Sequence, residues 1–339
     1  MKAYVLRFGP YSAAVDRRTA VTLAALVVAA LGLALLGLCQ GATWASPVEV
    51  LRALAGQGDA VVVITEWRAP RVAAALVFGA ALGLSGAIFQ NLTRNPLGSP
   101  DVIGLDSGAY TGALVVITML GGTSAQLAVG SIVGGLVTAA AVYVLSARGG
   151  LSGLRLIVIG IAVNAILVAL NSWIVLRAEL EVAIAATAWH AGSLNGVNWE
   201  DVLLPFAVIG VLAAGAPFLA HAIQQSALGD EVAMTSGVDL PRLRLLLVLA
   251  GVTCTSTVTA VAGPIAFIAL SAPQIGRRLA GAPGVPLAPA ALTGAVLLLA
   301  ADLAAQLLLA PISLPVGVVT TVIGGCYLIW LLYREVRRA

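Results

Sequence analysis

Residues 79–109 read GAALGLSGAIFQNLTRNPLGSPDVIGLDSGA, and this stretch contains a helix, a break and the start of a second helix. The charge-free run 72–92 leads into the break, and the charge-free run 107–147 follows it. Apolar runs of about 20 residues are long enough to cross the hydrocarbon core of a membrane as helices. The stretch therefore predicts two membrane-spanning helices joined by a connection that carries charge, proline and glycine.

Prolines specify the break itself. Pro96 and Pro100 cannot donate a backbone hydrogen bond, and they push Asn95 and Ser99 out of the helical region. Non-helical backbone at membrane depth is tolerated only where it is buried in protein or faces water. Asp101 suits the start of the next helix. We therefore predict a rigid broken turn at the inner mouth of a pathway, part of a cytoplasmic gate: Arg94, Asn95, Pro96, Pro100 and Asp101.

The composition of the whole chain is that of a membrane protein. Of its 339 residues, 60% are hydrophobic and 10% are charged, and the mean hydropathy is +1.03. A soluble domain carries about 25% charged residues, so a soluble fold is excluded, and the net charge of +3 does not indicate nucleic-acid binding. The apolar run 19–39 is longer than the ~7–15-residue core of a signal peptide, so we expect it to be retained as the first helix.

Division of the chain at charges, prolines and glycines predicts an all-α polytopic fold of about ten spans. We expect one transmembrane domain, 1–339, with a short cytoplasmic tail at 1–18. The expected spans are 19–40, 70–91, 107–121, 125–146, 155–176, 202–222, 243–262, 266–281, 287–310 and 315–333, of which the eighth is short and interrupted by proline. With the N-terminus inside, only Arg52, Arg68, Arg71 and Arg177 of the eighteen Lys and Arg residues fall outside. This bias predicts that both termini are cytoplasmic.

The inside segment at about 224–242 carries the signal of a short helix. Gly229 and Gly237 bracket a run short enough for two helical turns. Asp230 and Glu231 would stand in the first turn, where carboxylates favour the helix dipole. A short helix lying across the membrane face fits a groove in a partner. The alternative is a solvated connecting loop.

Three polar features of the apolar regions each have two interpretations. Arg68 and Arg71 flank Pro70 and are either interface anchors or cationic sites for acidic residues of an external partner. Asp302 is the only carboxylate deep in an expected span. It either hydrogen-bonds to a neighbouring helix or serves a proton-coupled carrier. Ser85, within Gly-Leu-Ser-Gly, either permits close helix packing or acts as the nucleophile of an intramembrane hydrolase.

Motifs for ATP hydrolysis and metal binding are absent from the sequence. Lys2 is the single lysine, so no Walker A motif exists, and any ATP would be hydrolysed by another subunit. His190 and His221 are the only histidines, and the three cysteines show no metal-ligand or disulfide spacing. We expect a transport subunit that is not an enzyme, with no catalytic residue, metal or cofactor of its own.

Six motifs, in order over nearly the whole chain, resemble the permease subunits of bacterial ABC importers for iron–siderophores, haem and cobalamin. They are Arg68-Ala69-Pro70-Arg71; the stretch 79–109; Trp189…Gly192-Ser193-Leu194…Trp199; Leu228-Gly229-Asp230-Glu231-Val232-Ala233 with Ser236-Gly237-Val238; Gly263-Pro264-Ile265-Ala266-Phe267; and Leu314-Pro315-Val316-Gly317-Val318. The stretch NPLGSPDVIG at 95–104 is most similar to the corresponding stretch of permeases for catecholate siderophores.

The resemblance implies a type II ABC importer permease of ten helices in the bacterial cytoplasmic (inner) membrane. Its substrate would be a ferric siderophore, with cobalamin or haem as the alternative. Its partners would be a second permease subunit, two ATPase subunits that hold ATP and Mg, an extracytoplasmic siderophore-binding protein and membrane lipid, but no nucleic acid. Arg68 and Arg71 would receive glutamates of the binding protein. The ATPase-coupling helix would contain Gly229, Asp230, Glu231, Ala233 and Gly237.

The sequence departs from the family pattern at three places. Gln306 stands where the family often has an arginine after Ala301-Asp302, and Gln274 replaces the histidine of a V-P-H motif. Gly324-Gly325-Cys326 replaces a common G-x-P. A missing docking arginine is tolerable where a different permease chain supplies one, so a heterodimer is favoured over a homodimer.

Overall fold

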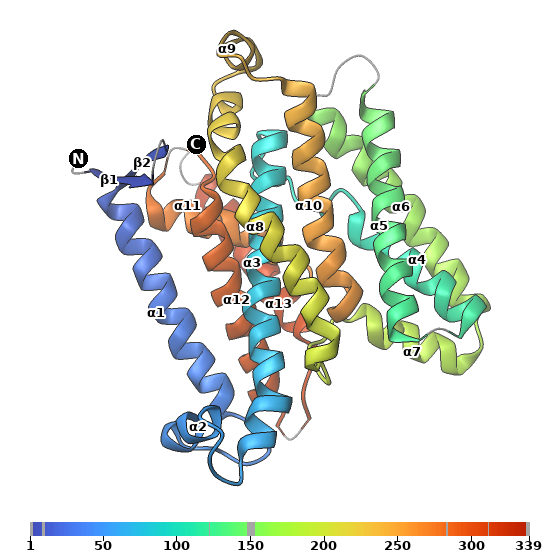
Figure 1. Cartoon of the computed structure of the whole chain (residues 1–339). Helices are drawn as coiled ribbons and strands as arrows, with labels where there is room; N and C mark the ends of the chain where they lie inside the picture. The colour runs from blue at the N-terminus through green and yellow to red at the C-terminus, as the bar shows by residue number, and fades with distance from the viewer. Residues whose placement is uncertain are drawn as a thin grey trace.

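The computed structural model describes residues 3–8, 11–121, 123–147, 153–282, 284–310 and 312–336. Over these residues the protein is a bundle of helices that run roughly alongside one another (Figure 1). Ten helices occupy the positions of the ten expected spans: α1 (Arg17–Cys39), α3 (Ala69–Thr93), α4 (Leu105–Leu120), α5 (Ser124–Ala147), α6 (Gly153–Arg177), α8 (Trp199–Ala227), α10 (Leu240–Ala262), α11 (Ile268–Ala280), α12 (Leu287–Leu307) and α13 (Val316–Val336). The shorter elements are β1 (Ala3–Phe8), β2 (Tyr11–Asp16), α2 (Pro47–Leu54), the π-helical η1 (Val63–Arg68), α7 (Leu180–His190) and α9 (Asp230–Thr235).

The lengths of these helices confirm a helical, polytopic membrane fold and correct one expected span. By length and composition, seven described helices are able to cross a membrane when η1 and α3 are counted together. Helix α4 is a shorter apolar helix, and Val316–Trp330 is a further apolar segment within α13. The 13 residues of α11 cover about 20 Å at 1.5 Å per residue, less than the ~30 Å hydrocarbon core. Because Gly263 and Phe267 both have a φ of 69°, the chain between α10 and α11 is not helical, and α11 starts late.

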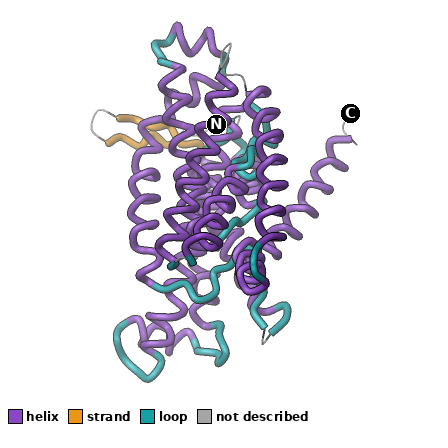
Figure 2. The backbone as a smooth tube through the Cα atoms, turned by 90° about the vertical axis from the view of Figure 1, so that its right-hand side faces the viewer, coloured by secondary structure: helices purple, strands orange, loops and turns teal. Residues whose placement is uncertain are grey.

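The N-terminal segment, expected as a short tail, forms an antiparallel hairpin. Strand β1 pairs with β2 from Ala3 opposite Asp16 to Phe8 opposite Tyr11, and α1 follows directly. The hairpin, α9 and the C-terminal end of α13 lie towards one end of the bundle, and α2 lies at the other (Figures 1 and 2). Some residues in the positive-inside count lie outside the described ranges: Lys2, Arg148, Arg337 and Arg338.

Helix α3 lies at the centre of the bundle, and its small residues allow close packing. In the most apolar part of the span formed by η1 and α3, 78% of the residues are buried, whereas the corresponding share in α8 is 11%. Gly79 of α3 faces Gly294 of α12 so closely that a methyl group on Gly79 would collide with the Gly294 carbonyl oxygen, and Gly86 meets Ala269 of α11 in the same way. Lipid supplies no hydrophobic force between helices, so close backbone contact of this kind holds them together.

Arginines cap helix C-termini near both ends of α1. Arg68 Nη1 donates to the carbonyl oxygens of Leu38 and Cys39, the last two residues of α1, at 2.9 Å each. Near the start of α1, Arg18 Nε donates to the Leu279 carbonyl oxygen at the end of α11, at 3.0 Å. The last carbonyl groups of a helix have no partner within the helix, and a cation there also complements the helix dipole. These caps tie α1 to the neighbouring helices.

Candidate functional site

The predicted coupling segment forms the short helix α9, which lies beyond the ends of α8 and α10 (Figure 1). Gly229 and Gly237, on its two sides, have φ values of 125° and 86°. Residues other than glycine rarely adopt such positive φ values. Ala233 is buried against the rest of the chain. The apolar side chains around it are 46–67% exposed: Leu228, Val232 and Met234. The helix therefore presents an apolar surface outside the bundle, which is typical of a surface that a partner covers.

Asp230, the first residue of α9, pairs with two arginines. Arg94 Nη2 donates to Asp230 Oδ1 at 2.5 Å, and Arg244 Nη2 donates to Asp230 Oδ2 at 2.7 Å. The hydrogen bond from Arg244, together with that from Arg94, holds the pKa of the Asp230 carboxyl below its usual range. Arg94 Nη2 also donates to the Ser226 carbonyl oxygen of α8 at 2.7 Å. The predicted gate residue and a predicted coupling residue are therefore in direct contact.

The predicted broken turn separates α3 from α4. Arg94 ends α3 in the left-handed conformation, with a φ of 51°, and Asn95 Oδ1 accepts a hydrogen bond from Leu97 N at 2.9 Å. Helix α4 starts at Leu105, whose N–H donates to the Pro100 carbonyl oxygen at 3.1 Å. The helix break expected from the two prolines is confirmed.

Asp101 caps a different helix from the one expected. The N-cap of α4 is Gly104, whereas Asp101 Oδ2 accepts a hydrogen bond from Phe267 N, at the start of α11, at 3.2 Å. The chain before α11 is not helical, so the first N–H groups of α11 need an acceptor from another segment. The expectation that Asp101 starts the helix that follows it was therefore wrong.

Gln274 of α11 makes a second contact with the broken turn. Its Nε2 donates to Gln90 Oε1 at 2.6 Å and lies 3.5 Å from the Pro96 carbonyl oxygen. Sequence reasoning noticed Gln274 only as a replaced histidine, and it missed Gln90 and Arg244 altogether. The one available signal was that a buried amide or a charge at a helix end needs a partner, and this signal does not say which partner.

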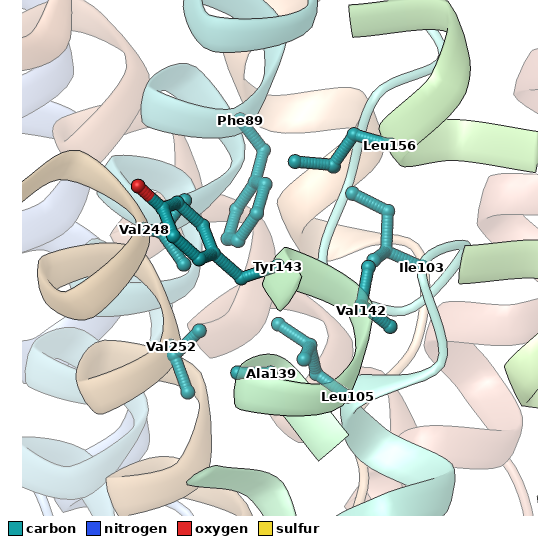
Figure 3. Close-up of a pocket in the computed structure, with 9 residues that line it drawn as sticks. All are labelled: Phe89, Ile103, Leu105, Ala139, Val142, Tyr143, Leu156, Val248 and Val252. Carbon is teal, nitrogen blue, oxygen red and sulfur yellow. The ribbon is translucent and has the colours of Figure 1, made fainter. Parts of the chain in front are cut away.

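A small apolar cavity lies beside the broken turn (Figure 3). Its volume is about 10 Å³, which holds at most about one water molecule. The residues that line it come from the turn and from five helices: Phe89, Ile103, Leu105, Ala139, Val142, Tyr143, Leu156, Val248 and Val252. Ile103 and Leu105 are both buried here. Close-packed side chains do not deform continuously, so movement of the turn requires this cluster to repack.

At the opposite end of α3, Arg71 and Asp302 form a two-pronged ion pair. Arg71 Nε donates to Asp302 Oδ2 at 2.9 Å, and Arg71 Nη2 donates to Asp302 Oδ1 at 2.8 Å. Gln306 Nε2 donates to Asp302 Oδ2 at 2.9 Å. Asp302 therefore is not alone, contrary to expectation, because α3 and α12 pack side by side and place a cation at its depth. The hydrogen bond to a neighbouring helix, one of the two predicted roles, is confirmed.

Arg68 and Arg71 line one cavity at this end of the bundle. The cavity measures about 300 Å³, and Gln40, Thr43 and Gln306 also contribute to its wall. Arg68 already binds carbonyl groups of α1, and Arg71 already binds Asp302. Their role in docking a binding protein stays a prediction, in which an incoming carboxylate has to share these cations with internal acceptors.

Ser85 is used for helix packing. It is fully buried, and its Oγ donates to the Gly251 carbonyl oxygen of α10 at 2.8 Å and lies 2.9 Å from Thr255 Oγ1. His190 stacks on Tyr110, with ring centroids 4.1 Å apart. Because both partners of Ser85 belong to α10 and neither is a histidine, the serine lacks the adjacent base that a nucleophile requires.

Comparison with known proteins identifies the family of the chain. A model of the FecCD transport family matches residues 25–334. The ferric enterobactin transport system permease protein FepG of Escherichia coli (strain K12) is 47% identical over 326 residues, which cover 96% of this chain and 99% of that protein. The achromobactin transport system permease protein CbrC of Dickeya dadantii (strain 3937) is 34% identical, covering 98% of this chain and 96% of that protein.

A solved structure has the same fold. It is an inward-facing conformation of a metal-chelate type ABC transporter, with 27% sequence identity and a TM-score of 0.81 over 93% of this chain and 99% of that chain. The chain belongs to the FecCD transport family, the permeases of ABC importers for iron–siderophores, haem and cobalamin, and as such a permease it is a transport subunit without catalytic activity of its own.

Proposed function

We propose that this chain is the permease subunit through which an ABC importer moves a ferric siderophore of the catecholate type across the bacterial cytoplasmic membrane. The observation that carries the substrate class is the 47% identity, over 96% of the chain, to a permease named for ferric enterobactin. Relatives named for achromobactin transport and for hemin transport are 34% and 36% identical, so the preference for a catecholate siderophore rests on the 47% identity alone.

In this proposal the end of the bundle with α9 faces the cytoplasm and an ATPase subunit covers α9. The apolar side chains of Val232 and Met234 are exposed outside the spans, where neither lipid nor the bundle covers them. Gly229 and Gly237 set the path of the chain into and out of α9 through their positive φ angles. Ala233 is buried and holds the helix against the bundle, and Glu231 is exposed. ATP and Mg would be held by the ATPase.

The opposite end of the bundle would receive the binding protein. We assign the docking role to the cavity that Arg68 and Arg71 line. Asp302 neutralises part of the charge of Arg71, so Arg68 would supply more of the attraction for an incoming glutamate. Gln306 donates to Asp302 and adds no positive charge of its own. A second, different permease chain with its own docking cation completes the site in this proposal.

Uptake by the reconstituted importer tests the proposed function. The permease would be co-expressed with the ATPase, the second permease and the binding protein, and placed in proteoliposomes. We expect ATP-dependent accumulation of radioactive iron supplied as ferric enterobactin, and little competition from cobalamin or haem. Preferential uptake of haem or cobalamin would overturn the substrate class. Uptake that continues without ATP on a proton gradient would overturn the ABC mechanism and restore the proton-coupled carrier.

The variant Gly237→Pro tests the coupling helix within the same system. Proline fixes φ near −65°, whereas Gly237 has a φ of 86°, so the exit of α9 has to rearrange. We expect loss of the ATP hydrolysis that the loaded binding protein stimulates, with docking of the binding protein preserved. Normal stimulation in this variant would contradict the assignment of α9.

A further inference from the structure

The carboxylate of Asp230 joins the ends of two spans, and one of its partners also contacts a third span. Its Oδ1 accepts from Arg94 at the end of α3, and its Oδ2 accepts from Arg244 near the start of α10. Arg94 also donates to the Ser226 carbonyl oxygen near the end of α8. Both carboxylate oxygens are engaged from different helices, so the group is fixed in direction as well as in position.

Besides these ion pairs, the short connections to α8 and α10 and one buried residue position α9 relative to the spans. Ala233 is its one buried residue, and Val238 N donates to the Ala233 carbonyl oxygen at 3.0 Å just after the helix. Glu231, next to Asp230, is exposed. A helix of six residues is too short to be held by its own hydrogen bonds. The ion pairs of Asp230, the buried contact of Ala233 and the short connections to α8 and α10 together set where α9 lies.

From Arg94 the contacts continue through the broken turn to α11. Arg94 is the first residue of the turn, and the Pro96 carbonyl oxygen lies within 3.5 Å of Gln274 Nε2 on α11. At the far end of the turn, Asp101 caps α11 at Phe267. The turn thus lies between α9, which the ATPase would cover, and the short helix α11. It makes polar contacts with both.

We propose that Arg94, Asp230 and Arg244 form an ion triad that transmits displacement of α9 to α3 and to the broken turn. This inference rests on the proposed function, because it requires an ATPase that moves α9. Asp230 in this view is a positioning residue that faces inward, and not one of the residues that grip the ATPase. Its side chain is 41% exposed, so water screens the pairs and their effect on stability is small. Their effect is on which segments move together.

A simpler role for Asp230 would be to complement the dipole of α9. Aspartate and glutamate both stabilise a helix from its first turn, and Glu231 also stands there. Arg94→Gln and Arg244→Gln therefore break the triad and leave both first-turn carboxylates in place. Arg242→Gln is the control, because Arg242 lies near Arg244 but pairs with Asp239, at 3.0 Å, on the same segment.

The experiment uses the complete importer in proteoliposomes and measures substrate moved per ATP hydrolysed. Variants Asp230→Asn, Arg94→Gln and Arg244→Gln are compared with Arg242→Gln. Coupling free energies between sites correspond to factors of about 5 to 150, so we expect Asp230→Asn to lower this ratio by at least about fivefold. The ATPase should still co-purify, and Arg94→Lys, which keeps the charge, should recover part of the loss.

Two outcomes would overturn the triad. One is a transport ratio for Asp230→Asn equal to that of Arg242→Gln. The other is loss of ATPase co-purification in Asp230→Asn but not in Arg94→Gln or Arg244→Gln, which would make Asp230 a direct contact of the ATPase. Failure of the proposed function would look different, because the unaltered importer would then show no ATP-driven uptake at all.

Discussion

Arg71 of α3 and Asp302 of α12 are joined by two hydrogen bonds across 231 positions of sequence, from Nε to Oδ2 at 2.9 Å and from Nη2 to Oδ1 at 2.8 Å. Asp302 is 1% exposed and Arg71 is 18% exposed. Gln306 holds Oδ2 from the next turn of α12. A carboxylate with both oxygens occupied in this way is a structural tie between two spans.

Removal of one partner of this ion pair should destabilise the permease. Asp302→Asn leaves the guanidinium of Arg71 without its counter-ion, which for a buried pair costs about 3 kcal/mol. Thermal unfolding in detergent would measure the loss. The double variant Arg71→Met with Asp302→Leu removes both charges and should recover most of it. A single variant as stable as the original protein would show that the pair contributes nothing to stability.

The close crossing of α3 and α12 predicts opposite effects for two glycine substitutions. In Gly79→Ala the new methyl group collides with the backbone of Gly294, and overpacking of this kind costs about 1–3 kcal/mol. Gly210 of α8 has no atom near the position of an added methyl group, so Gly210→Ala should be neutral or stabilising by up to about 1 kcal/mol. Both are measured by thermal unfolding. Equal effects in the two variants would contradict the close crossing.

The exposed apolar surface of α9 predicts the effect of a new charge there. Met234 is 57% exposed, so Met234→Asp should leave the fold of the permease unchanged but place a charge in the surface that the ATPase is proposed to cover. We expect loss of ATPase co-purification at normal permease yield. Leu54 of α2 is 52% exposed at the other end of the bundle, so Leu54→Asp is the matched control. Retained ATPase binding in Met234→Asp would show that the interface with the ATPase does not include the exposed face of α9.

The pKa of Asp230 predicts how coupling depends on pH. Its pKa lies below 3.8 because Arg244, and then Arg94, donate to the ionised form. A lowered pKa in the folded state means that the ion pairs contribute fully above the unfolded value and are lost as the pH falls through the folded value. Between about pH 5 and pH 8 we therefore expect Asp230→Asn to lower transport per ATP by the same factor. A factor that changes within this range would show that Asp230 titrates there.

Local rules predicted most of the helices and the break between α3 and α4. A segment in lipid has to satisfy its own backbone hydrogen bonds, so charge-free runs of sufficient length become helices wherever the chain packs. Proline acts on its own backbone and on the preceding residue, so the chain was expected to leave the helix near Asn95, and α3 ends just before it, at Thr93. Glycine at 229 and 237 marked the ends of α9 for the same local reason. None of these conclusions depended on which helices are neighbours.

By itself the sequence therefore determined a polytopic helical membrane protein, the position of its broken turn and its short helix α9, because these follow from backbone chemistry within a few residues. Only the tertiary structure decided that Asp101 caps α11, that Asp302 pairs with Arg71, and that Asp230 lies between Arg94 and Arg244. Each of these partners is a polar group at a helix end or at membrane depth that needs a counterpart. Which counterpart it meets depends on how the spans pack side by side and at what depth, and hydropathy along one chain does not contain that information.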